Sequence, residues 1–242
     1  MKKKIVLSFD LEFWYNSEFL KKYVPPRAEN QPDYVLESTL PLLDLLKENG
    51  VKATFFVLGK LAEKYPTLIQ KIFDEGHEIA SHGYSHKSLQ DLKEENFEKE
   101  IVLTNEILKK ITGEYPSLFR APAFSLKKDN KWALNILKKH NLKNLSKGPA
   151  FSGGIYFRIM PLRLFLYYLK AANWNETPIL YFHPYELFES SPRINSGPWY
   201  KRKIKYLGTK NAWKKFQALQ KKFNFISFKD HFNENSINNQ EF

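Results

Sequence analysis

Residues 51–82, VKATFFVLGKLAEKYPTLIQKIFDEGHEIASH, contain a complete strand–helix–strand pattern. The apolar run VKATFFVLG predicts a buried strand, and residues 61–75 are expected to form the helix that follows it. Gly76 is suited to end that helix, because glycine accepts the left-handed conformation that helix ends often need. HEIASH, at residues 77–82, then predicts a further short strand. Two strands joined by a helix indicate a parallel pair with a right-handed crossover.

The same alternation continues along the rest of the chain. Further strands are expected at residues 4–13, 117–124, 178–183 and 223–228. Further helices are expected at residues 33–48, 93–111, 128–140, 161–172 and 211–222. Loops are expected at residues 141–154 and between residues 183 and 211. Strands that alternate with helices predict an α/β fold with a parallel sheet, either open or closed into a barrel.

The chain has 242 residues, which suits one large domain with a sizeable core. We therefore expect a single catalytic domain at residues 1–232 and a polar C-terminal tail at residues 233–242. There is no cysteine, which excludes disulfides, zinc ribbons and thiol nucleophiles. Any metal site must use histidine and carboxylate ligands.

The net charge of +12 is spread over lysine-rich helical segments, which indicates solvated surfaces more than a nucleic-acid site. No nucleic-acid partner is expected. The densest basic block is KRKIK at residues 201–205, flanked by Trp199, Tyr200 and Tyr206. This block predicts weak peripheral contact with an anionic membrane surface or an acidic saccharide carrier.

The N-terminal segment MKKKIVLSFDLEF has an apolar run of only Ile5 to Leu7 before Asp10. A secretory signal needs an apolar run of about 7–15 residues, so none is predicted. No later segment approaches the roughly 18 apolar residues of a membrane span. The expected location is the cytoplasm.

Side chains that can act as metal ligands, acids or bases follow four of the expected strands. They are Asp10 and Glu12, His82 and His86, Arg120, and His183. The carboxyl ends of parallel strands lie at one edge of an α/β sheet, where sites form. Each residue alone admits a structural role as a cap, an ion-pair partner or a core histidine. Together, at successive strand ends, they favour one functional site.

The chemistry of such a site follows from the residue types. On a helical turn, His82 and His86 would lie about 5–6 Å apart, which suits Zn²⁺. One carboxylate would complete a three-ligand site with an open position for water, whose pKa the metal lowers. The second carboxylate could act as a base, an arginine could hold it, and a distant histidine could protonate a leaving group.

Four motifs occur in a fixed order: SFDLE at residues 8–12, SHGYSH at 81–86, FRAPAF at 119–124 and ILYFHP at 179–184. With these motifs the chain resembles the polysaccharide deacetylases of carbohydrate esterase family four, also called the NodB homology domain. The similarity covers roughly residues 4–190. The segments TFFVLGKLAEKYP and SGGIYFRIMP and the FNFISF ending look closest to members from exopolysaccharide loci. The resemblance implies a deformed (β/α) barrel of about seven parallel strands that removes N-acetyl groups from amino sugars with a divalent metal.

The resemblance also implies a role for each matching residue. Asp10 would be the base, Arg120 would orient it, and His183 would be the acid. The ligands of Zn²⁺ or another divalent metal would be Glu12, His82 and His86. The backbone N–H near Ala123 would stabilise the oxyanion together with the metal.

The sequence departs from the family pattern in three places. The family has two adjacent aspartates, whereas here Leu11 separates Asp10 from Glu12, so the roles of the two acids could be exchanged. Ala123 and Phe124 stand where many members have tyrosine. The aspartate and tryptophan motif expected before His183 is missing, and residues 141–153 form a shorter segment. This puts turnover and substrate preference in doubt more than metal binding.

The leading hypothesis is an N-deacetylase that acts on a lipid-linked or nucleotide-linked saccharide intermediate. Aromatic faces suit sugar rings, and the candidate substrate contacts are Trp14, Tyr15, Tyr156 and Arg158. The alternatives are a metal-poor hydrolase of C–N bonds in small cyclic amides, a non-haem iron oxygenase, and a catalytically degenerate protein that only binds saccharide.

Overall fold

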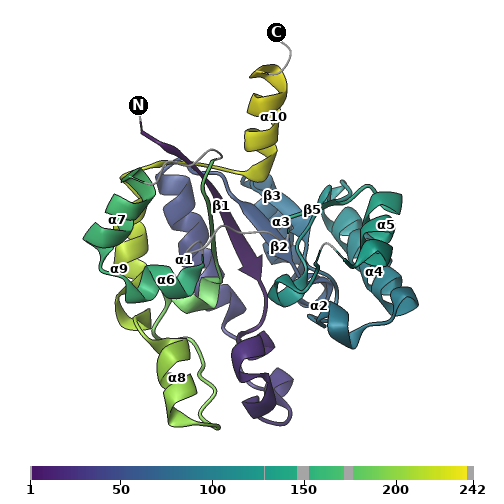
Figure 1. The fold of residues 1–242 in the computed structure, drawn as a ribbon, viewed down its shortest axis with the longest axis horizontal. Helices are drawn as coiled ribbons and strands as arrows, with labels where there is room; N and C mark the ends of the chain where they lie inside the picture. Colours follow the sequence, from purple (N-terminus) through teal and green to yellow (C-terminus); the bar gives the residue numbers. More distant parts are fainter. Residues whose placement is uncertain (1, 128, 146–152, 172–176, 239–242) are drawn as a thin grey trace. The chain divides into compact units, whose positions relative to one another are not determined.

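The computed structural model describes residues 2–127, 129–145, 153–171 and 177–238. The chain contacts form two compact units, which are described separately. Unit 1 contains residues 1–9, 13–53 and 149–242. Unit 2 contains residues 10–12 and 54–148. Figure 1 shows the elements of both units.

Unit 2 contains a parallel sheet whose strands follow the order β2, β3, β4, β5. The strands are β2 (Thr54–Val57), β3 (Glu78–Ser81), β4 (Leu118–Phe119) and β5 (Lys143–Asn144). Strand β5 lies inside the segment expected to be a loop, so that prediction was wrong at this point. Two residues are too few to show the alternation that identifies a strand in a sequence.

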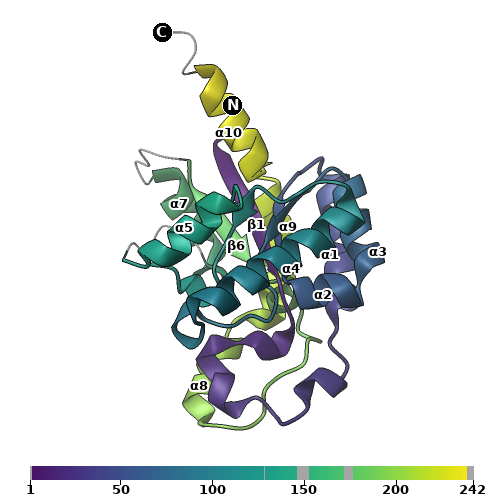
Figure 2. The ribbon, with the colours of Figure 1, turned by 90° about the vertical axis from the view of Figure 1, so that its right-hand side faces the viewer.

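The helices of unit 2 are α2 (Gly59–Lys64), α3 (Pro66–Asp74), α4 (Glu94–Thr112) and α5 (Lys131–Lys139). The single helix expected at residues 61–75 is divided at Tyr65. The following Pro66 has no N–H to donate, so it begins a new helix at the first position, where no donor is needed. Figure 2 shows α2, α3 and α4 lying next to one another.

Helices α4 and α5 pack against β4 and form one hydrophobic cluster of unit 2. The Phe97 ring of α4 contacts Phe119 of β4 edge-on, with ring centroids 5.7 Å apart, and Trp132 of α5 at 5.6 Å. Ile101 and Leu137 are buried in the same cluster. The apolar spacing along each helix therefore identifies the side that packs on the sheet.

In unit 1, β1 (Lys4–Leu11) pairs in parallel with β6 (Ile179–Phe182) and with β7 (Asn224–Ile226). Phe9 pairs with Phe182, and Ile5 pairs with Phe225. The last two residues of β1 belong to unit 2. This run is buried throughout except at Lys4, as expected for a strand covered on both faces.

The helices of unit 1 are α1 (Val35–Glu48), α6 (Gly154–Ile159), α7 (Leu162–Ala171), α8 (Trp199–Tyr206), α9 (Thr209–Gln220) and α10 (Phe228–Asn238). Helix α1 buries Leu42, Leu43, Leu45 and Leu46, whereas Leu36 and Leu40 are exposed. Helices α6, α7 and α9 are grouped in Figure 1. Edge-on aromatic contacts join Phe157 of α6 and Phe216 of α9 to Phe182 of β6, at 5.2 and 5.3 Å.

Several elements of unit 1 differ from the expectations. Helix α6 falls partly and α8 wholly in segments expected to be loops, and α8 buries none of its side chains. Tyr206 of α8 packs against a hydrophobic cluster of unit 1, but Trp199, Tyr200 and Ile204 are exposed, so the amphipathic signal toward a core is weak. The strand expected at residues 223–228 is shortened to β7, and α10 runs into the segment expected to be a polar tail.

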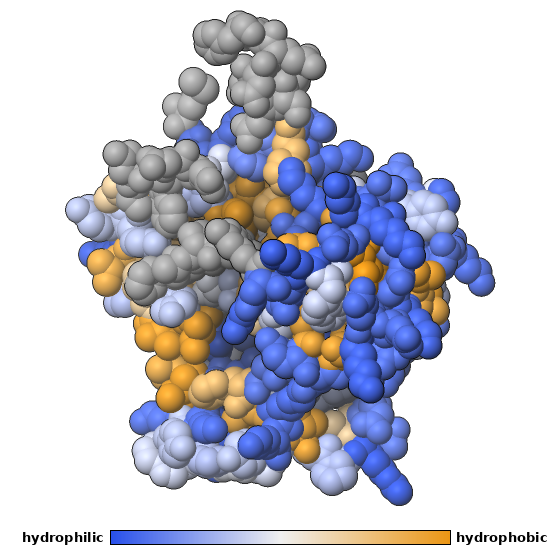
Figure 3. Space-filling model, turned by 45° about the vertical axis from the view of Figure 1, so that its right-hand side comes forward, coloured by the Kyte–Doolittle hydropathy of each residue, from blue (hydrophilic) through white to orange (hydrophobic). Residues whose placement is uncertain are grey.

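Six short 3₁₀ helices complete the described part of the chain. They are Trp14–Asn16, Glu18–Tyr23, Ala28–Asn30, Leu89–Asp91, Pro122–Phe124 and Pro184–Leu187. Among the described residues, no helix is both long and apolar enough to cross a membrane. The face in Figure 3 is mostly hydrophilic, with separate hydrophobic areas between the polar side chains.

Candidate metal and catalytic site

Three buried side chains of unit 2 form a potential metal site. Their donor atoms, from Glu12, His82 and His86, all lie within 4.8 Å of one another. Oε2 of Glu12 lies 2.5 Å from Nε2 of His86 and 3.7 Å from Nε2 of His82. Glu12 directly follows β1, and His82 directly follows β3. The strand ends therefore bring together the three residues that the sequence nominated as ligands.

The two histidines lie on a loop and not on a helical turn, so the helical part of the prediction was wrong. His86 has a φ of +61°, in the left-handed region that is costly for a residue with a side chain. The two imidazole rings nevertheless have centroids 5.5 Å apart. A reversal of the backbone, not helical periodicity, brings them close.

Helix α2 holds this loop from one side. The N–H of Gly59 donates to the carbonyl oxygen of Gly83 at 2.9 Å, and the N–H of Lys60 donates to that of Tyr84 at 3.2 Å. These donors belong to the first turn of α2, where N–H groups have no partner within the helix. A Cβ atom at Gly59 would lie 2.7 Å from both Thr104 and Tyr84, so the close approach requires glycine.

Helix α4 holds the loop from the other side through Glu100. One carboxylate oxygen of Glu100 accepts from the N–H groups of Tyr84 and Ser85, each at 3.2 Å. Its other oxygen accepts from the Ser85 hydroxyl. The Tyr84 hydroxyl donates to Glu63 at 2.7 Å, which raises the pKa of Tyr84. Glu100 was not among the site residues expected from the sequence, because Glu100 lies in helix α4 and in none of the four motifs.

The donor set fits a divalent metal such as Zn²⁺. Nδ1 of His82 lies 2.8 Å from the backbone oxygen of Arg120. A carbonyl oxygen only accepts, so Nδ1 carries the ring proton and the lone pair is on Nε2, on the side of Glu12. Two imidazole nitrogens and one carboxylate are a frequent ligand set of catalytic zinc, with bonds of about 2.0–2.2 Å. Donors within 4.8 Å of one another are close enough to share one ion.

Arg120 connects the potential metal site to Asp10. Its Nη1 donates to Oδ1 of Asp10 at 2.5 Å, and both side chains are buried. The guanidinium lies over the Phe56 ring, 3.8 Å from the centroid. Arg120 therefore fixes Asp10 with its side chain and His82 with its backbone oxygen.

The turn at residues 122–124 places a backbone donor at the surface of unit 2. Ala123 and Phe124 both have a φ of +52°, and Ala123 is exposed. Among the described residues, the N–H of Ala123 has no hydrogen-bond partner. A donor held in this way can bind a negative oxygen.

His183 lies in unit 1, directly after β6. Its Nδ1 lies 3.2 Å from Oε2 of Glu186, which is buried. Glu186 also faces Nη2 of Arg158 and Nζ of Lys205, each 3.4 Å from Oε1. Burial by itself raises the pKa of Glu186, but the charges of His183, Lys205 and Arg158 outweigh it and hold the pKa well below its ordinary value.

The residues nominated for sugar contact have different surroundings. Trp14 is 3% exposed, and its Nε1 donates to the carbonyl oxygen of Pro32 at 3.3 Å. Arg158 is 3% exposed and belongs to the charge cluster around Glu186. These two side chains therefore have roles inside unit 1. Tyr15 stacks on Phe13 with centroids 5.0 Å apart, and Tyr156 is 45% exposed. Sugar contact by Trp14, Tyr15, Tyr156 and Arg158 stays a prediction.

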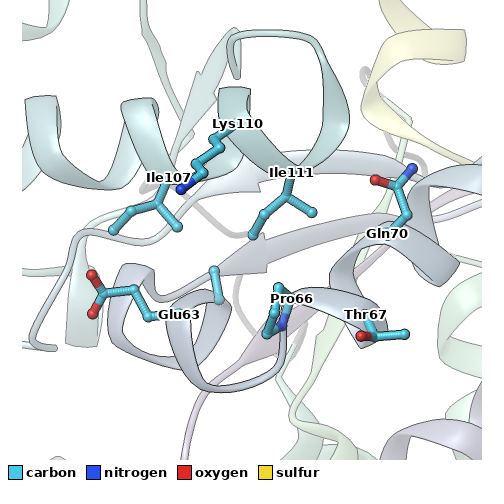
Figure 4. A pocket seen from close by; sticks show the side chains of 8 residues that line it. Glu63, Pro66, Thr67, Gln70, Ile107, Lys110 and Ile111 are labelled. Atoms are coloured by element: carbon cyan, nitrogen blue, oxygen red, sulfur yellow. The ribbon is translucent and has the colours of Figure 1, made fainter.

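A pocket of about 730 Å³ lies between α4 and the pair α2–α3, and none of the candidate site residues lines it. Figure 4 shows Ile107 and Ile111 of α4 facing Pro66 across it, with Glu63 at one end. Glu63, which lines the pocket, accepts from Tyr84 of the histidine loop. The pocket is therefore separate from the candidate chemistry.

Two family models match this chain. The polysaccharide deacetylase model matches residues 28–145, which include His82, His86 and Arg120. A second model, described as a domain of unknown function (DUF3473), matches residues 136–233, which include Arg158, His183 and Glu186. The segment with Asp10 and Glu12, where the sequence departs from the family pattern, lies outside both matches.

Comparison with known proteins agrees with this result. A peptidoglycan-N-acetylglucosamine deacetylase of Bacillus cereus is 38% identical over 120 residues, or 49% of this chain and 43% of the relative. The chain spans less than half the length of the first curated relatives that it matches.

Solved structures show the same fold. The peptidoglycan deacetylase PdaC from Bacillus subtilis has a TM-score of 0.62 at 18% identity, over 99% of this chain and 95% of that one. A CE4 family pseudoenzyme from Bacillus anthracis has a TM-score of 0.58 at 17% identity, over 95% of this chain and 65% of that one. The expected deformed (β/α) barrel of parallel strands is thereby confirmed. The exopolysaccharide-locus type stays a prediction.

Proposed function

We propose that this chain, whose residues 28–145 form a polysaccharide deacetylase domain, hydrolyses the N-acetyl group of an amino sugar in a saccharide. The observation that carries the proposal is the pair of features linked by Arg120. One is the cluster of Glu12, His82 and His86, and the other is the buried Asp10 carboxylate. A metal site would provide the Lewis acid, and a fixed carboxylate the general base, that hydrolysis of an amide needs.

The metal proposed for the cluster is Zn²⁺ or another divalent ion, which would supply a Lewis acid and lower the pKa of water. Asp10 accepts the proton of the attacking water in this mechanism, while Arg120 keeps the carboxylate in place. The N–H of Ala123 donates to the carbonyl oxygen as negative charge develops there. His183 donates the proton that the departing amine requires.

The contacts support one assignment of the two acids. Glu12 faces both imidazole nitrogens, as a ligand would. The Oδ1 atom of Asp10 instead accepts from Arg120, as an oriented base would. We therefore propose Glu12 as the ligand and Asp10 as the base, although the order is unusual for the family.

The substrate proposed is a saccharide intermediate on a lipid or nucleotide carrier in the cytoplasm. A pocket of about 470 Å³ beside α8 supports a phosphate-bearing carrier. The basic residues that line it are Arg193, Arg202, Lys203 and Lys210. Basic groups in a pocket attract phosphate oxygens. The same surface supports weak peripheral contact with an anionic membrane.

The decisive experiment measures acetate release and metal content together. The wild-type protein, supplied with Zn²⁺ and N-acetylglucosamine oligomers, is expected to release acetate and to hold one metal ion. His82→Ala is expected to lose both, and Asp10→Asn is expected to keep the metal and lose activity. His140→Ala is the matched control, because His140 pairs with Glu98 away from the site.

Two results would contradict the proposal in different ways. Retained saccharide binding and metal without acetate release from any acetylated sugar would favour a catalytically degenerate binding protein. The CE4 pseudoenzyme among the structural neighbours gives that alternative a precedent within the fold. Absence of metal in the wild-type protein, even after Zn²⁺ is supplied, would refute the metal-dependent mechanism.

A further inference from the structure

The segment that follows β6 brings a carboxylate to His183. The N–H of Glu186 donates to the carbonyl oxygen of His183 at 2.9 Å and closes the turn that begins the 3₁₀ helix Pro184–Leu187. Because of this turn, side chains three residues apart meet, and Nδ1 of His183 lies 3.2 Å from Oε2 of Glu186. The contact is part of the local fold of HPYE, not an encounter of two flexible surface groups.

The two oxygens of Glu186 have different partners. Oε1 faces the cations of Arg158 and Lys205, each at 3.4 Å, and Oε2 faces His183. A Cβ atom at Gly154 would lie 2.6 Å from Oε2, so the backbone of α6 encloses the carboxylate and leaves no room for a larger residue. The carboxylate is therefore held in one orientation.

The cations that hold Glu186 are themselves fixed. Nη1 of Arg158 donates to the carbonyl oxygens of Lys205 and Leu207, at 2.8 and 3.2 Å. Nζ of Lys215 donates to three carbonyl oxygens at the end of α6, which fixes the backbone on which Arg158 stands. Burial lowers the pKa of Lys215. The charge cluster thus joins α6, α8 and α9 around one buried carboxylate.

From this geometry we infer that Glu186 is the positioning residue of His183, and that Arg158 and Lys205 hold Glu186 as a carboxylate. The ionised carboxylate only accepts hydrogen bonds, so the proton of the imidazole stays on Nδ1 and a second proton binds at Nε2. The negative charge also stabilises the imidazolium form.

The carboxylate that meets His183 comes from three residues downstream, and the cations that hold this carboxylate come from α6 and α8. The catalytic meaning of the inference rests on the proposed function, in which His183 protonates the leaving amine. The pairing itself is independent of turnover and is testable without it.

The test is an NMR titration of the His183 imidazole, assigned by comparison with His183→Asn. Among the described contacts, the charged groups that face the pair are Arg158 on α6 and Lys205 on α8, and the rings of Tyr181 and Tyr185 lie 6.3 and 5.3 Å from the His183 ring. Glu186→Gln removes the negative charge and is expected to lower the proton affinity of His183 about tenfold, which is one pH unit. Lys205→Met removes a positive charge and is expected to raise the proton affinity of His183.

Controls separate positioning from a purely structural role. Glu189→Gln changes an exposed acid three residues further along and is expected to leave the His183 titration unchanged. Glu186→Asp retains the charge and is expected to restore part of the proton affinity. If Glu186→Gln fails to fold, the Lys205→Met titration still tests the inference, because Lys205 lies at the edge of the cluster.

The outcomes distinguish the inference from the proposed function. Opposite shifts in the two variants, in a protein that releases no acetate, would support the inference and refute the deacetylase activity. Unchanged His183 titration in Glu186→Gln or in Lys205→Met would overturn the inference, whatever the activity. In an active protein, Glu186→Gln is also expected to shift the alkaline limb of the pH–kcat profile downward.

Discussion

Left-handed backbone conformations gather at the candidate site. Six described residues other than glycine have positive φ values, and three of them are His86, Ala123 and Phe124. Such a conformation costs roughly 1–3 kcal/mol, so surrounding contacts must enforce it. At His86 the conformation accompanies a contact of 2.5 Å between its Nε2 atom and Glu12. At Ala123 it leaves an exposed N–H group.

Arg120 allows a direct test at the residue scale. Arg120→Met leaves the buried Asp10 carboxylate without its guanidinium, and an unpaired buried charge costs about 3–5 kcal/mol. We therefore expect a large fall in the free energy of unfolding, measured by urea denaturation. The double variant Asp10→Asn/Arg120→Met is expected to recover part of the loss. A loss below about 0.5 kcal/mol in the single variant, like that of an exposed substitution such as Lys139→Met, would mean that the pair does not form.

At the scale of elements, α2 and α4 act as two clamps on the histidine loop. The N-terminal N–H groups of α2 donate to loop carbonyl oxygens, and the Glu100 carboxylate of α4 accepts from loop N–H groups. Contacts beyond the ligands orient metal sites, and their loss typically reduces metal affinity 10–100-fold. The loop conformation is thus set by protein contacts around it.

Glu100→Gln tests the clamp of α4. An amide presents only one acceptor oxygen, so the variant cannot serve both loop N–H groups and the Ser85 hydroxyl as well as the carboxylate does. We expect about 10–100-fold weaker Zn²⁺ binding by competition with a chelating dye, with the circular dichroism unchanged. Glu106→Gln on the same helix is the control, since Glu106 bonds only Tyr115 among the described contacts. Equal affinities of both variants would show that the clamp does not tune the site.

Helix α8 has an unusual exposed side. Trp199, Tyr200 and Ile204 of α8, and Leu207 directly after it, are all more than 40% exposed, and the exposed Lys203 lies among them. Aromatic and apolar side chains mixed with lysine suit the headgroup region of an anionic membrane. We expect the protein to sediment with vesicles of phosphatidylcholine and phosphatidylserine and to dissociate at high salt.

A charge reversal tests this expectation. One basic residue contributes about 1 kcal/mol near an anionic surface, so Lys203→Glu is expected to weaken vesicle binding more than fivefold. Lys138→Glu, an exposed lysine on α5, makes the same change elsewhere. Equal weakening by both variants would indicate a nonspecific effect of net charge, and no binding by the wild-type protein would refute the contact.

At the scale of the whole molecule, Glu186 links stability to pH. Its pKa in the folded protein lies below the ordinary value of 4.5, so the contribution of the carboxylate to stability is present above pH 4.5. That contribution is lost as the pH falls below this value. The unfolded chain then binds a proton at Glu186 more readily than the folded protein does, because the pKa of Glu186 is lower in the folded protein. Glu186→Gln removes the titration.

Thermal unfolding between pH 3 and pH 7 measures this difference. We expect the wild-type melting temperature to fall more steeply than that of Glu186→Gln below about pH 4.5. Glu189→Gln, which lies outside the charge cluster, is expected to follow the wild type. If the melting temperatures of all three proteins depend on pH in the same way, the pKa of Glu186 is not lowered by folding.

The sequence by itself determined the alternation of strands and helices and the residues that follow the strands. Apolar runs and helical spacing are local properties, so β1, β2, β3, α1 and α4 were found close to their observed bounds. The residues of the potential metal site, Glu12, His82 and His86, and the Asp10 partner Arg120 were also expected at strand ends. They follow strands, and parallel strands present their carboxyl ends at one edge.

The tertiary structure alone decided what each site residue contacts. The histidines approach through a left-handed loop and not through a helical turn, and Glu100 holds that loop from another helix. Arg158 faces Glu186, and α8 turns Lys205 and Tyr206 inward without burying any residue completely. These features depend on contacts between residues far apart in the chain. Local periodicity records which side of an element is buried, but not which partner a polar side chain meets there.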